Sequence, residues 1–512
     1  MNVAVALTSP VVPAWLAACI EALRRQPELT TRVVRVAGAA PAPPGGPAAR
    51  LGGKALAPVT VALDEGDLHA ADLVVDLTAG GVASGGSHGV WSFRLGENDD
   101  RTLPFAHEIA AGARTFEIAL VRRIGERREA LRIGRFAVTR WYPSTLKLAL
   151  SQAARWPATL AAALASGAQL DAVREETAPH SLQLGALGRA RFGAALLARL
   201  AGAAATALLQ IDEWNVGFVD GGPRALLAEG PLRVRWLPAP DRNAFIADPF
   251  VVARNGVRAV FVETIGFADE RGRIEALVLD ENDRVVRRER AIDGATHLSY
   301  PYPLEIDGEL YLVPENSAGN EVALYRCVRF PDRWEREAAL FAGFDGVDTT
   351  LFRHDGRWWA FCTRWSHGST LALFAFHAET PRGRWTPHAL NPIVVDVASA
   401  RPAGQPFLVD GTLYRPAQDC SQTYGGALAI ARIDLLTPTA YRETIVRRHG
   451  ARAFGRWGDG IHTVSFCGDT VVVDGKRAYR DPRKLPLAAK KVGAHVARLF
   501  NRRRPAKEAT FA

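Results

Sequence analysis

Apolar and polar residues follow different patterns in different parts of the chain. In residues 1–145, short apolar runs such as Val3–Leu7 and Asp72–Leu77 predict strands, and the amphipathic run Ala14–Arg25 predicts a helix. Strands that alternate with helices are typical of an α/β domain with a parallel sheet. Residues 146–211 are rich in Ala and Leu and predict a helical connector to the rest of the chain.

From Trp214 onwards the chain consists of short strand-like runs, aromatic residues and tight turns that repeat. Five turn pairs each separate two β-rich runs: Asn255-Gly256, Asp307-Gly308, Asp355-Gly356, Asp410-Gly411 and Gly468-Asp469. Measured on the glycines, the successive spacings are 52, 48, 55 and 57 residues. Asn-Gly and Asp-Gly pairs between apolar runs predict hairpins, because both turn residues adopt positive φ. Five hairpins at this period predict a five-bladed β-propeller over residues 212–477.

The fifth repeat lacks its outer strands after Val473, and two strand-like runs stand ahead of the first complete blade. We expect these runs, Trp214–Val219 and Leu232–Leu237, to complete the fifth blade and close the ring. The predicted fold is therefore multidomain, with an N-terminal α/β domain, a helical connector and a C-terminal all-β propeller.

Basic residues are concentrated at the C-terminus. The net charge is +9, but Lys476 to Lys507 holds twelve Lys and Arg against one acid, Asp481. The rest of the chain is close to neutral, so we expect no nucleic-acid partner. In the predicted basic tail, residues 478–512, the run Leu485–Phe500 predicts a short amphipathic helix. It either lies on an anionic membrane surface or remains a solvated tail.

Other features bear on the location of the protein. Val3–Leu7 has no preceding positive region and does not predict a signal peptide. Leu200–Ile211 is apolar for only twelve residues, which is short of a membrane span. The five cysteines are odd in number and form no C-x-x-C pair, which argues against a disulfide framework or a zinc site. We expect a cytoplasmic protein, peripheral to the inner face of the membrane, without metal or cofactor.

Residues at the start of each innermost strand face the central channel of a propeller, where a ligand on the axis would bind. Each of these residues taken singly could also be a solvated turn residue, but five aligned strand starts favour a site. The candidate residues, including those on second strands of blades two and four, are Asp248, Ser299, Tyr300, Glu315, Asp348, Arg401, Arg415, Gln418, Asp419 and His462.

Asp248, in Asp-Pro-Phe, and Asp348, in Asp-Thr-Thr-Leu-Phe, stand where five-bladed propeller glycosidases of the arabinanase and levansucrase type carry aspartates. The region resembles these glycosidases, and the resemblance implies that both aspartates are catalytic. In that family a Glu on blade four is the general acid, whereas this chain has Arg401-Pro-Ala-Gly there. Hydrolysis normally needs two carboxyl groups, so Glu315 on blade two is the candidate acid.

A second set of short motifs extends across the propeller region. These motifs are Asp248-Pro-Phe, Phe261-Val-Glu263, Gly272-Arg-Ile274, Tyr300-Pro, Val313-Pro-Glu315, Arg415-Pro-Ala-Gln418 with Tyr424-Gly425, and Gly460-Ile-His-Thr463. They resemble the propeller that precedes the glycosyltransferase domain in plant glucosamine inositolphosphorylceramide transferases. Because that glycosyltransferase domain has no counterpart here, the resemblance implies a glycan or glycolipid context but not the transferase activity.

Residues 1–145 resemble the formyltransferases that act on methionyl-tRNA or on nucleotide-linked amino sugars. The alignment puts Ser92 and Arg94 at the family's Asn and His, and Arg132 at its Asp. With all three positions changed, neither a general base nor a carboxylate to orient it remains. The resemblance therefore implies a former enzyme that now serves in binding or scaffolding.

Three functions remain open from the sequence. The first is an enzyme that hydrolyses or transfers a glycan at Asp248, Asp348 and Glu315. The second is a non-catalytic glycan-recognition partner of glycosyltransferases, which the missing carboxylate on blade four favours. The third is a formyltransferase acting on an amino sugar. In the first two, the partner is a glycan or a glycolipid.

Overall fold

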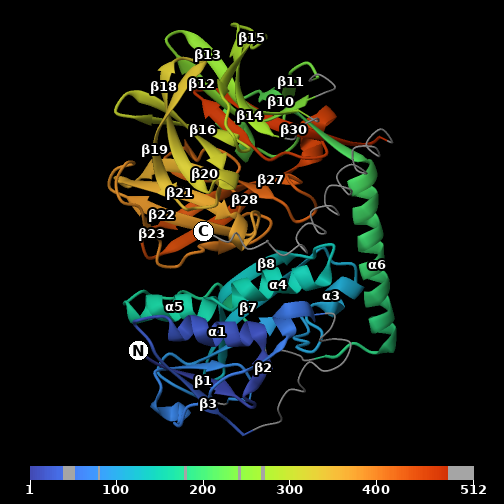
Figure 1. Ribbon diagram of the computed structural model, residues 1–512, viewed down its shortest axis with the longest axis vertical. Coiled ribbons are helices and arrows are strands. Elements are labelled where there is room, and N and C mark those ends of the chain that lie inside the picture. Colours follow the sequence, from blue (N-terminus) through green and yellow to red (C-terminus); the bar gives the residue numbers. More distant parts are fainter. Residues whose placement is uncertain are drawn as a thin grey trace, which may run out of the picture.

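The computed structural model describes residues 1–37, 52–78, 81–82, 84–177, 182–239, 244–266 and 271–481. They form an N-terminal α/β body and a C-terminal all-β body, and helix α6 (Ala186–Leu209) runs alongside both (Figure 1). The predicted amphipathic helix Leu485–Phe500 in the basic tail lies outside the described residues.

A seven-stranded mixed sheet forms the N-terminal body, in the order β3-β1-β5-β6-β7-β8-β9. The strands are β1 (Asn2–Leu7), β3 (Thr30–Arg35), β5 (Leu73–Asp76), β6 (Val90–Leu95), β7 (Thr115–Ile124), β8 (Arg127–Ala137) and β9 (Arg174–Glu175), and a separate pair is β2 (Val11–Pro13) with β4 (Pro58–Thr60). The pairs among β3, β1, β5 and β6 are parallel, as predicted, and the remaining pairs are antiparallel. The prediction of a purely parallel sheet was wrong for these pairs. The turn Gly125-Glu126 links β7 to β8, and a two-residue turn joins antiparallel neighbours.

Helices cover the sheet and link it to the propeller. They are α1 (Ala14–Arg24), α3 (Ala106–Ala110), α4 (Tyr142–Ala153) and α5 (Trp156–Ala165). Residues of α1, α4 and α5 share one hydrophobic core with the sheet, in which Trp91 and Trp156 are fully buried. Leu371, Val395 and Val397 of the propeller belong to this same core. The two bodies therefore pack directly against each other.

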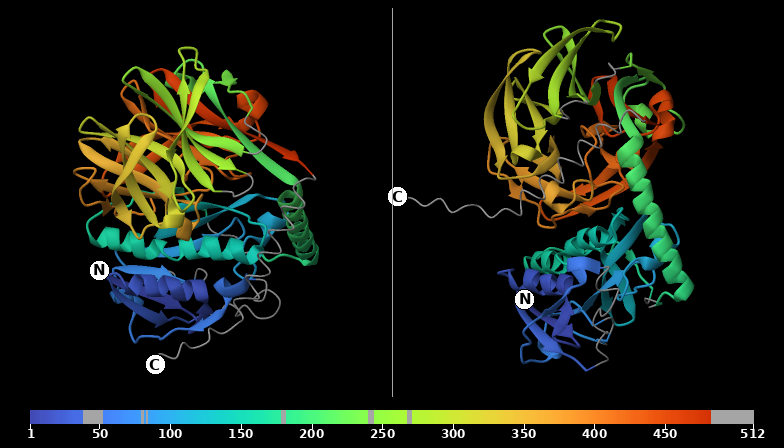
Figure 2. Two further views of the ribbon diagram at one scale, coloured as in Figure 1. Left: turned by 45° about the horizontal axis from the view of Figure 1, so that its top comes forward. Right: turned by 45° about the vertical axis from the view of Figure 1, so that its right-hand side comes forward.

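The C-terminal body consists of five sheets arranged as blades around a centre (Figure 2). Blade one consists of β12 (Ala244–Arg254), β13 (Val257–Gly266), β14 (Gly272–Leu279) and β15 (Val285–Ile292), and blade two of β16 (Ser299–Ile306), β17 (Glu309–Asn316), β18 (Glu321–Arg329) and β19 (Arg333–Ala342). Blade three consists of β20 (Gly346–His354), β21 (Arg357–Arg364), β22 (Ala372–Ala378), β23 (Thr386–Pro387) and β24 (Val394–Val395). Blade four consists of β25 (Phe407–Val409), β26 (Thr412–Asp419), β27 (Ala427–Leu436) and β28 (Tyr441–Gly450). Short 3-10 helices are η1 (Gly53–Leu56), η2 (Leu68–Ala70), η3 (Pro223–Leu227), η4 (Ser317–Gly319), η5 (Trp365–His367) and η6 (Ala451–Trp457). The predicted propeller with five blades is confirmed.

The predicted hairpin turns join the first two strands of every blade. In Asp355-Gly356, for example, φ is 48° for the aspartate and 75° for the glycine. The Asn-Gly and other Asp-Gly turns have the same pair of positive φ values. The turn residues thus determine where each blade folds back.

Blade five closes the ring with strands from both ends of the propeller sequence. Its order is β11-β10-β30-β29, with β10 (Gln210–Val219), β11 (Val234–Trp236), β29 (Val464–Cys467) and β30 (Thr470–Arg480). Strand β10 pairs with β30 from Gln210–Arg480 to Val219–Val471. The predicted closure is confirmed, and it also fixes α6, which continues directly into β10.

Candidate functional site

The innermost strands of blades one, two and three share a local distortion near their starts. In each, two residues of the inner strand lie opposite one residue of the second strand, for example between Ala247 and Phe250. Asp248, Tyr300 and Asp348 occupy these bulges with φ of 50°, 44° and 50°. A left-handed conformation in a residue other than glycine costs about 1–3 kcal/mol and is common at functional sites. The same strained position therefore carries a polar side chain in three successive blades.

Asp248 joins three blades through its hydrogen bonds. Its Oδ1 accepts from the Thr463 hydroxyl at 2.6 Å, and its Oδ2 accepts from the Tyr300 backbone N–H at 3.1 Å. The Asp248 N–H donates to Asp474 Oδ2 at 3.2 Å. Asp474, from β30, also accepts the backbone N–H groups of His462 and Thr463. A buried network of this kind holds the Asp248 carboxyl in one orientation.

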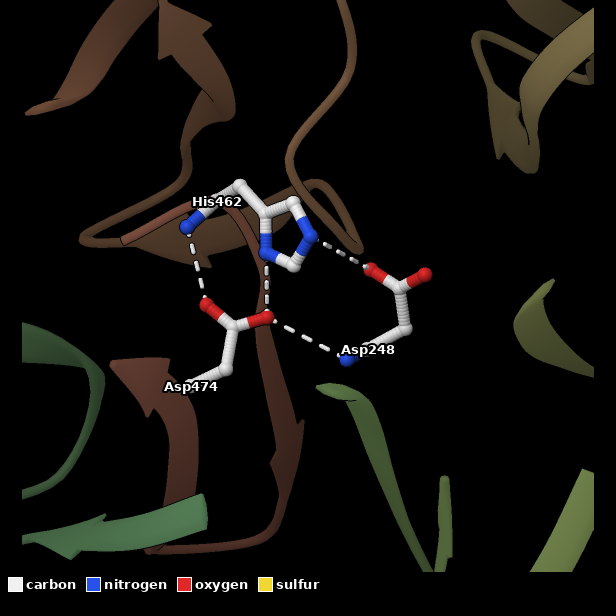
Figure 3. A group of neighbouring side chains, drawn as sticks. All are labelled: Asp248, His462 and Asp474. Atoms are coloured by element: carbon white, nitrogen blue, oxygen red, sulfur yellow. Dashed lines mark hydrogen bonds and ion pairs between the residues drawn. The ribbon is translucent and has the colours of Figure 1, made fainter. Parts of the chain in front are cut away.

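His462 lies between the carboxylates of Asp248 and Asp474 (Figure 3). Its Nε2 is 3.7 Å from Asp248 Oδ1, and its Nδ1 contacts Asp474 Oδ2 directly. Its ring also stacks on Trp214, with 4.1 Å between ring centroids. Burial alone would lower the pKa of His462, but the charges of Asp474 and Asp248 outweigh burial and raise the pKa to about 9. The imidazole is therefore a cation at neutral pH.

A second cluster links blades two, three and four. Arg401 donates to both oxygens of Asp348, at 2.6 and 3.1 Å, and lies 3.9 Å from Glu315. Gln418 donates to Asp348 Oδ2 at 2.8 Å. Burial raises the pKa of Asp348, whereas the Arg401 charge opposes this rise. Three donors on one carboxyl group favour its ionised form, so we describe Asp348 and Arg401 as an ion pair.

Tyr300 connects the two clusters. Its backbone N–H bonds to Asp248, and its hydroxyl accepts the Gly404 N–H at 2.8 Å and contacts Thr350 Oγ1 at 2.7 Å. Ser299, beside it, pairs with Glu315 across the first two strands of blade two. The structure thus brings together eight predicted residues, which are Asp248, Ser299, Tyr300, Glu315, Asp348, Arg401, Gln418 and His462.

Two predicted binding residues have other partners. Arg415 forms a buried ion pair with Glu443, at 2.6 and 2.7 Å, and donates to the Ser399 carbonyl oxygen. Asp419 pairs with Arg448 at 2.6 Å. Both partners come from β28, the outer strand of blade four. These contacts are explained by the packing of one blade and need no ligand.

The sequence patterns did not single out a Glu263–His297 pair near the axis. Glu263 is buried on β13, and its Oε1 lies 2.9 Å from Nε2 of the half-exposed His297. Burial raises the pKa of Glu263 to about 7, and His297 opposes that rise. The interaction with Glu263 raises the pKa of His297. A carboxyl group that titrates near neutral pH is suited to proton transfer.

Aromatic and basic side chains surround the clusters. The Arg401 guanidinium lies 5.2 Å from the centre of the Tyr424 ring, and the Lys476 ammonium lies 5.3 Å from that of Trp214. Lys476 also donates to the Tyr424 carbonyl oxygen at 2.9 Å. Tyr424 is 43% exposed, so its ring is accessible from solvent. The sequence patterns did not give Trp214 or Lys476 a role in the site.

The N-terminal body contacts loops that carry residues of the site. Arg114 donates to the Gln422 carbonyl oxygen at 3.1 Å, two residues before Tyr424. Gln152 donates to the carbonyl oxygen of His367, which shares η5 with Trp365. The Trp365 indole donates to Ser317, and the Ser317 hydroxyl donates to Glu315. A continuous set of contacts therefore leads from the N-terminal body to a carboxylate of the site.

The positions aligned with the formyltransferase site are engaged in contacts within the chain. Arg94 pairs with Glu176 at 2.9 Å and donates to the Gly96 carbonyl oxygen at 2.6 Å. Arg132 donates to the Leu390 carbonyl oxygen of the propeller at 2.9 Å. Both arginines therefore contribute to packing within the chain, and neither of them supplies a general base to Ser92 on β6.

The donor set at the axis allows more than one kind of ligand. Ligand atoms of Asp248, His462 and Asp474 lie within 4.8 Å of one another, so these residues could hold a cation. However, the His462 cation already occupies the space between the two carboxylates, and a metal would need its neutral ring. Carboxylates, a guanidinium and an exposed aromatic ring are also the groups that bind sugar hydroxyls and a sugar face.

Comparison with known proteins concerns mainly the propeller. Residues 238–454 match the family described as glucosamine inositolphosphorylceramide transferase 1, N-terminal. Over 208 residues the chain is 36% identical to glucosamine inositolphosphorylceramide transferase 1 of Oryza sativa subsp. japonica, which covers 40% of this chain and 28% of the relative. The Arabidopsis thaliana protein of the same name is 34% identical over 208 residues, which is 40% of this chain and 27% of the relative.

Two of the solved structures that match part of this chain do so at low identity and low TM-score. A GH43_1 enzyme from Xanthomonas citri complexed with xylotriose is 14% identical, with a TM-score of 0.36 over 45% of this chain and 82% of the other. The catalytic domain of Coprinopsis cinerea GH62 α-L-arabinofuranosidase is 16% identical, with a TM-score of 0.35 over 47% of this chain and 83% of the other. None of these comparisons supports the formyltransferase resemblance. The propeller is thus similar to the N-terminal region of the plant proteins, and the chain spans about 28% of the first of them.

Proposed function

We propose that the propeller binds a sugar-containing head group of a glycan or glycolipid at its axis. One observation carries the proposal: carboxylates from blades one, two and three and cations from blades four and five meet there, although burying charge is costly. Because buried charges add little to folding stability, ligand binding explains their presence at the axis better than folding does. The name of the plant relatives describes a sugar transferred to a lipid, which is a glycolipid context.

The chemistry of the site suits a sugar with an anionic substituent. The carboxylates of Asp248 and Glu315 accept hydrogen bonds from hydroxyl groups. Arg401, His462 and Lys476 supply positive charge around them, and such charge favours a phosphate or carboxylate on the ligand. The exposed Tyr424 ring offers a flat face for the sugar ring.

Binding can be tested with two matched substitutions at the axis. Asp248→Asn and Asp348→Asn each remove a charge from a residue with φ of 50°, a conformation that Asn accepts well. On a glycan array that includes glucosamine and inositol phosphate, each should weaken binding by roughly ten-fold or more, because a strong charge-assisted acceptor is lost.

Asp355→Asn is the matched control, since Asp355 has φ of 48° but lies in an exposed hairpin turn. It should bind like the natural chain. The proposal fails if no sugar binds, or if the two axis variants bind as tightly as the control.

Turnover is a second candidate, and Glu263 is the observation that favours it. Glycosyl cleavage needs one group to protonate the leaving oxygen and another to take a proton from the attacking water or hydroxyl. Glu263, with a pKa of about 7, suits the first role, and Asp248 suits the second. Glu315 is the other candidate acid.

Mass spectrometry of the bound sugar can separate turnover from recognition alone. If the site is catalytic, Glu263→Gln should lower product formation by roughly a hundred-fold or more and leave binding nearly unchanged. If the natural chain forms no product from any sugar that it binds, the function is recognition.

A further inference from the structure

Helix α6 is attached to the molecule along one face only. Phe192 is buried, and its ring meets Tyr142 of α4 edge-on at 5.2 Å. Arg199 donates to the carbonyl oxygens of Ala113 and Val138, at 2.5 and 3.4 Å. After Leu209 the chain continues into β10, which is paired with β30 in blade five. The helix is therefore held at its middle and at its end.

The opposite face of α6 is apolar and open to solvent, and the helix runs along the outside of the molecule (Figure 2, right). Its exposed residues are spaced alternately by three and four positions, which places them on one side of the helix. They form the apolar stripe Leu187, Ala190, Ala194, Leu197, Ala201, Ala204 and Leu208. Leu187 and Leu197 are 67% and 69% exposed.

The length and composition of α6 go beyond the sequence-based expectation. The run considered there was twelve residues long, but the helix has 24 residues with a mean hydropathy of 1.7 in its most apolar window. By length and composition alone it could cross a membrane. Because one face packs on α4 and the chain continues directly into β10 of blade five, this helix is placed to lie along a surface rather than across it.

The charged residues of α6 itself are all basic. The helix contains Arg189, Arg191 and Arg199 and no acidic residue. The backbone N–H of Asp481 donates to the Leu209 carbonyl oxygen at 2.8 Å, so the basic tail starts at the end of α6. From residue 482 to 507 that tail has nine Lys and Arg and no acid.

The charges of α6 help to decide what covers the apolar stripe: the basic tail, a second copy of the chain or an anionic lipid surface. The basic tail would bring like charges to a basic helix. A second copy of the chain would bring the same arginines without an acid to pair with them. An anionic lipid surface attracts both the helix and the tail. In addition, Trp141 is 54% exposed and stands next to Tyr142, which packs on α6, and tryptophan favours the membrane–water boundary.

We propose that α6 docks the protein on an anionic membrane, with the apolar stripe in the boundary between head groups and acyl chains. Arg189 and Arg191 then flank the stripe on the side of the anionic head groups. This inference does not depend on the sugar site. It would, however, hold the propeller at a surface where glycolipid head groups are displayed.

Co-sedimentation of the full chain with vesicles tests the proposal. The vesicles contain phosphatidylcholine alone or with phosphatidylglycerol, and no glycolipid, so the result does not depend on the sugar site. We expect binding to the anionic vesicles, weakened by salt. Leu197→Asp should reduce binding by roughly ten-fold or more, because it places a charge in the apolar stripe.

Leu408→Asp is the matched control, since Leu408 is 65% exposed on β25, far from α6 in the sequence. It should bind vesicles like the natural chain, and cooperative thermal unfolding followed by circular dichroism reports that both variants are folded. Arg189→Gln with Arg191→Gln should weaken binding by roughly five-fold per residue.

Three results would overturn the proposal. The first is the absence of binding to anionic vesicles. The second is equal binding by Leu197→Asp and Leu408→Asp. The third is a dimer in solution that Leu197→Asp dissociates while vesicle binding is absent, which would assign the stripe to a second copy.

Discussion

The buried ion pair at the centre of the propeller joins two different blades, whereas the ion pairs of Arg174 in the N-terminal body lie on one sheet. Arg401 on blade four binds Asp348 on blade three, and their side chains are 9% and 2% exposed. In the sheet, Arg174 binds Glu117 and Glu176 at 3.0 and 2.8 Å, and its side chain is 44% exposed. The first pair is withdrawn from water and the second remains in contact with it.

The two kinds of pair differ in what they contribute to stability. An exposed ion pair contributes little to stability, and a strand surface accepts it without cost. A buried pair often costs more in lost hydration than it returns, and apolar residues of the same volume would stabilise the fold equally well or better. Charges at the axis therefore indicate function more strongly than the more numerous charges on the sheet.

The largest expected effect comes from removing one partner of each pair. Arg401→Met leaves the Asp348 carboxylate buried with Gln418 as its remaining donor, and we expect it to lower the free energy of unfolding by about 3–5 kcal/mol. Arg174→Met removes a partly exposed cation and should lower the free energy of unfolding by less than about 1 kcal/mol. Chemical denaturation monitored by tryptophan fluorescence gives both values. Equal losses in the two variants would remove the distinction drawn here.

Local sequence signals predicted the arrangement of the blades. Each Asn-Gly or Asp-Gly turn specifies its own backbone conformation, so the hairpins, and with them the blade count, follow from residues that are adjacent in the chain. Asp248 and Asp348 were placed correctly at the strand starts for the same reason. The antiparallel half of the N-terminal sheet was not predicted, because strand order depends on contacts between distant segments.

The partners of the predicted site residues were harder to identify. Asp474 follows the buried run Val471–Val473, and Glu263 follows Phe261 and Val262. A carboxylate inside a strand, directly after an apolar run, was a usable signal, since an unpaired buried charge is costly. Asp474 lies beside Thr463 and His462 because β29 and β30 form one hairpin, so this contact is local in the chain. Glu263 meets His297 only because blades one and two pack side by side, which the local sequence does not show.

The direction in which α6 presents its apolar face was also beyond local reasoning. An apolar stripe on a helix normally predicts a buried face. Here the face toward the protein includes Arg199, which satisfies two carbonyl oxygens, and the outward face carries Leu187 and Leu197. Both faces of α6 can be read from the sequence, but only the packing shows which of them is turned toward the protein.

A smaller effect concerns the pH dependence of stability and tests the charge of His462. The pKa of His462 is raised from 6.5 to about 9, so the folded state binds its proton more tightly than the unfolded state does. The resulting stabilisation is complete below pH 6.5 and is lost as pH rises through about 9, by up to roughly 3 kcal/mol.

His462→Gln should flatten this dependence of the free energy of unfolding on pH. His388→Gln is the matched control, because burial lowers the pKa of His388 to about 4 and leaves it neutral throughout this range. Carboxylate–guanidinium pairs like those of the sheet keep their charges between pH 6.5 and 9. Unfolding midpoints measured across that range should therefore fall in the natural chain and in His388→Gln. If His462→Gln keeps the same slope, His462 is not the cation described here, and the positive charge at the axis comes from Arg401 and Lys476.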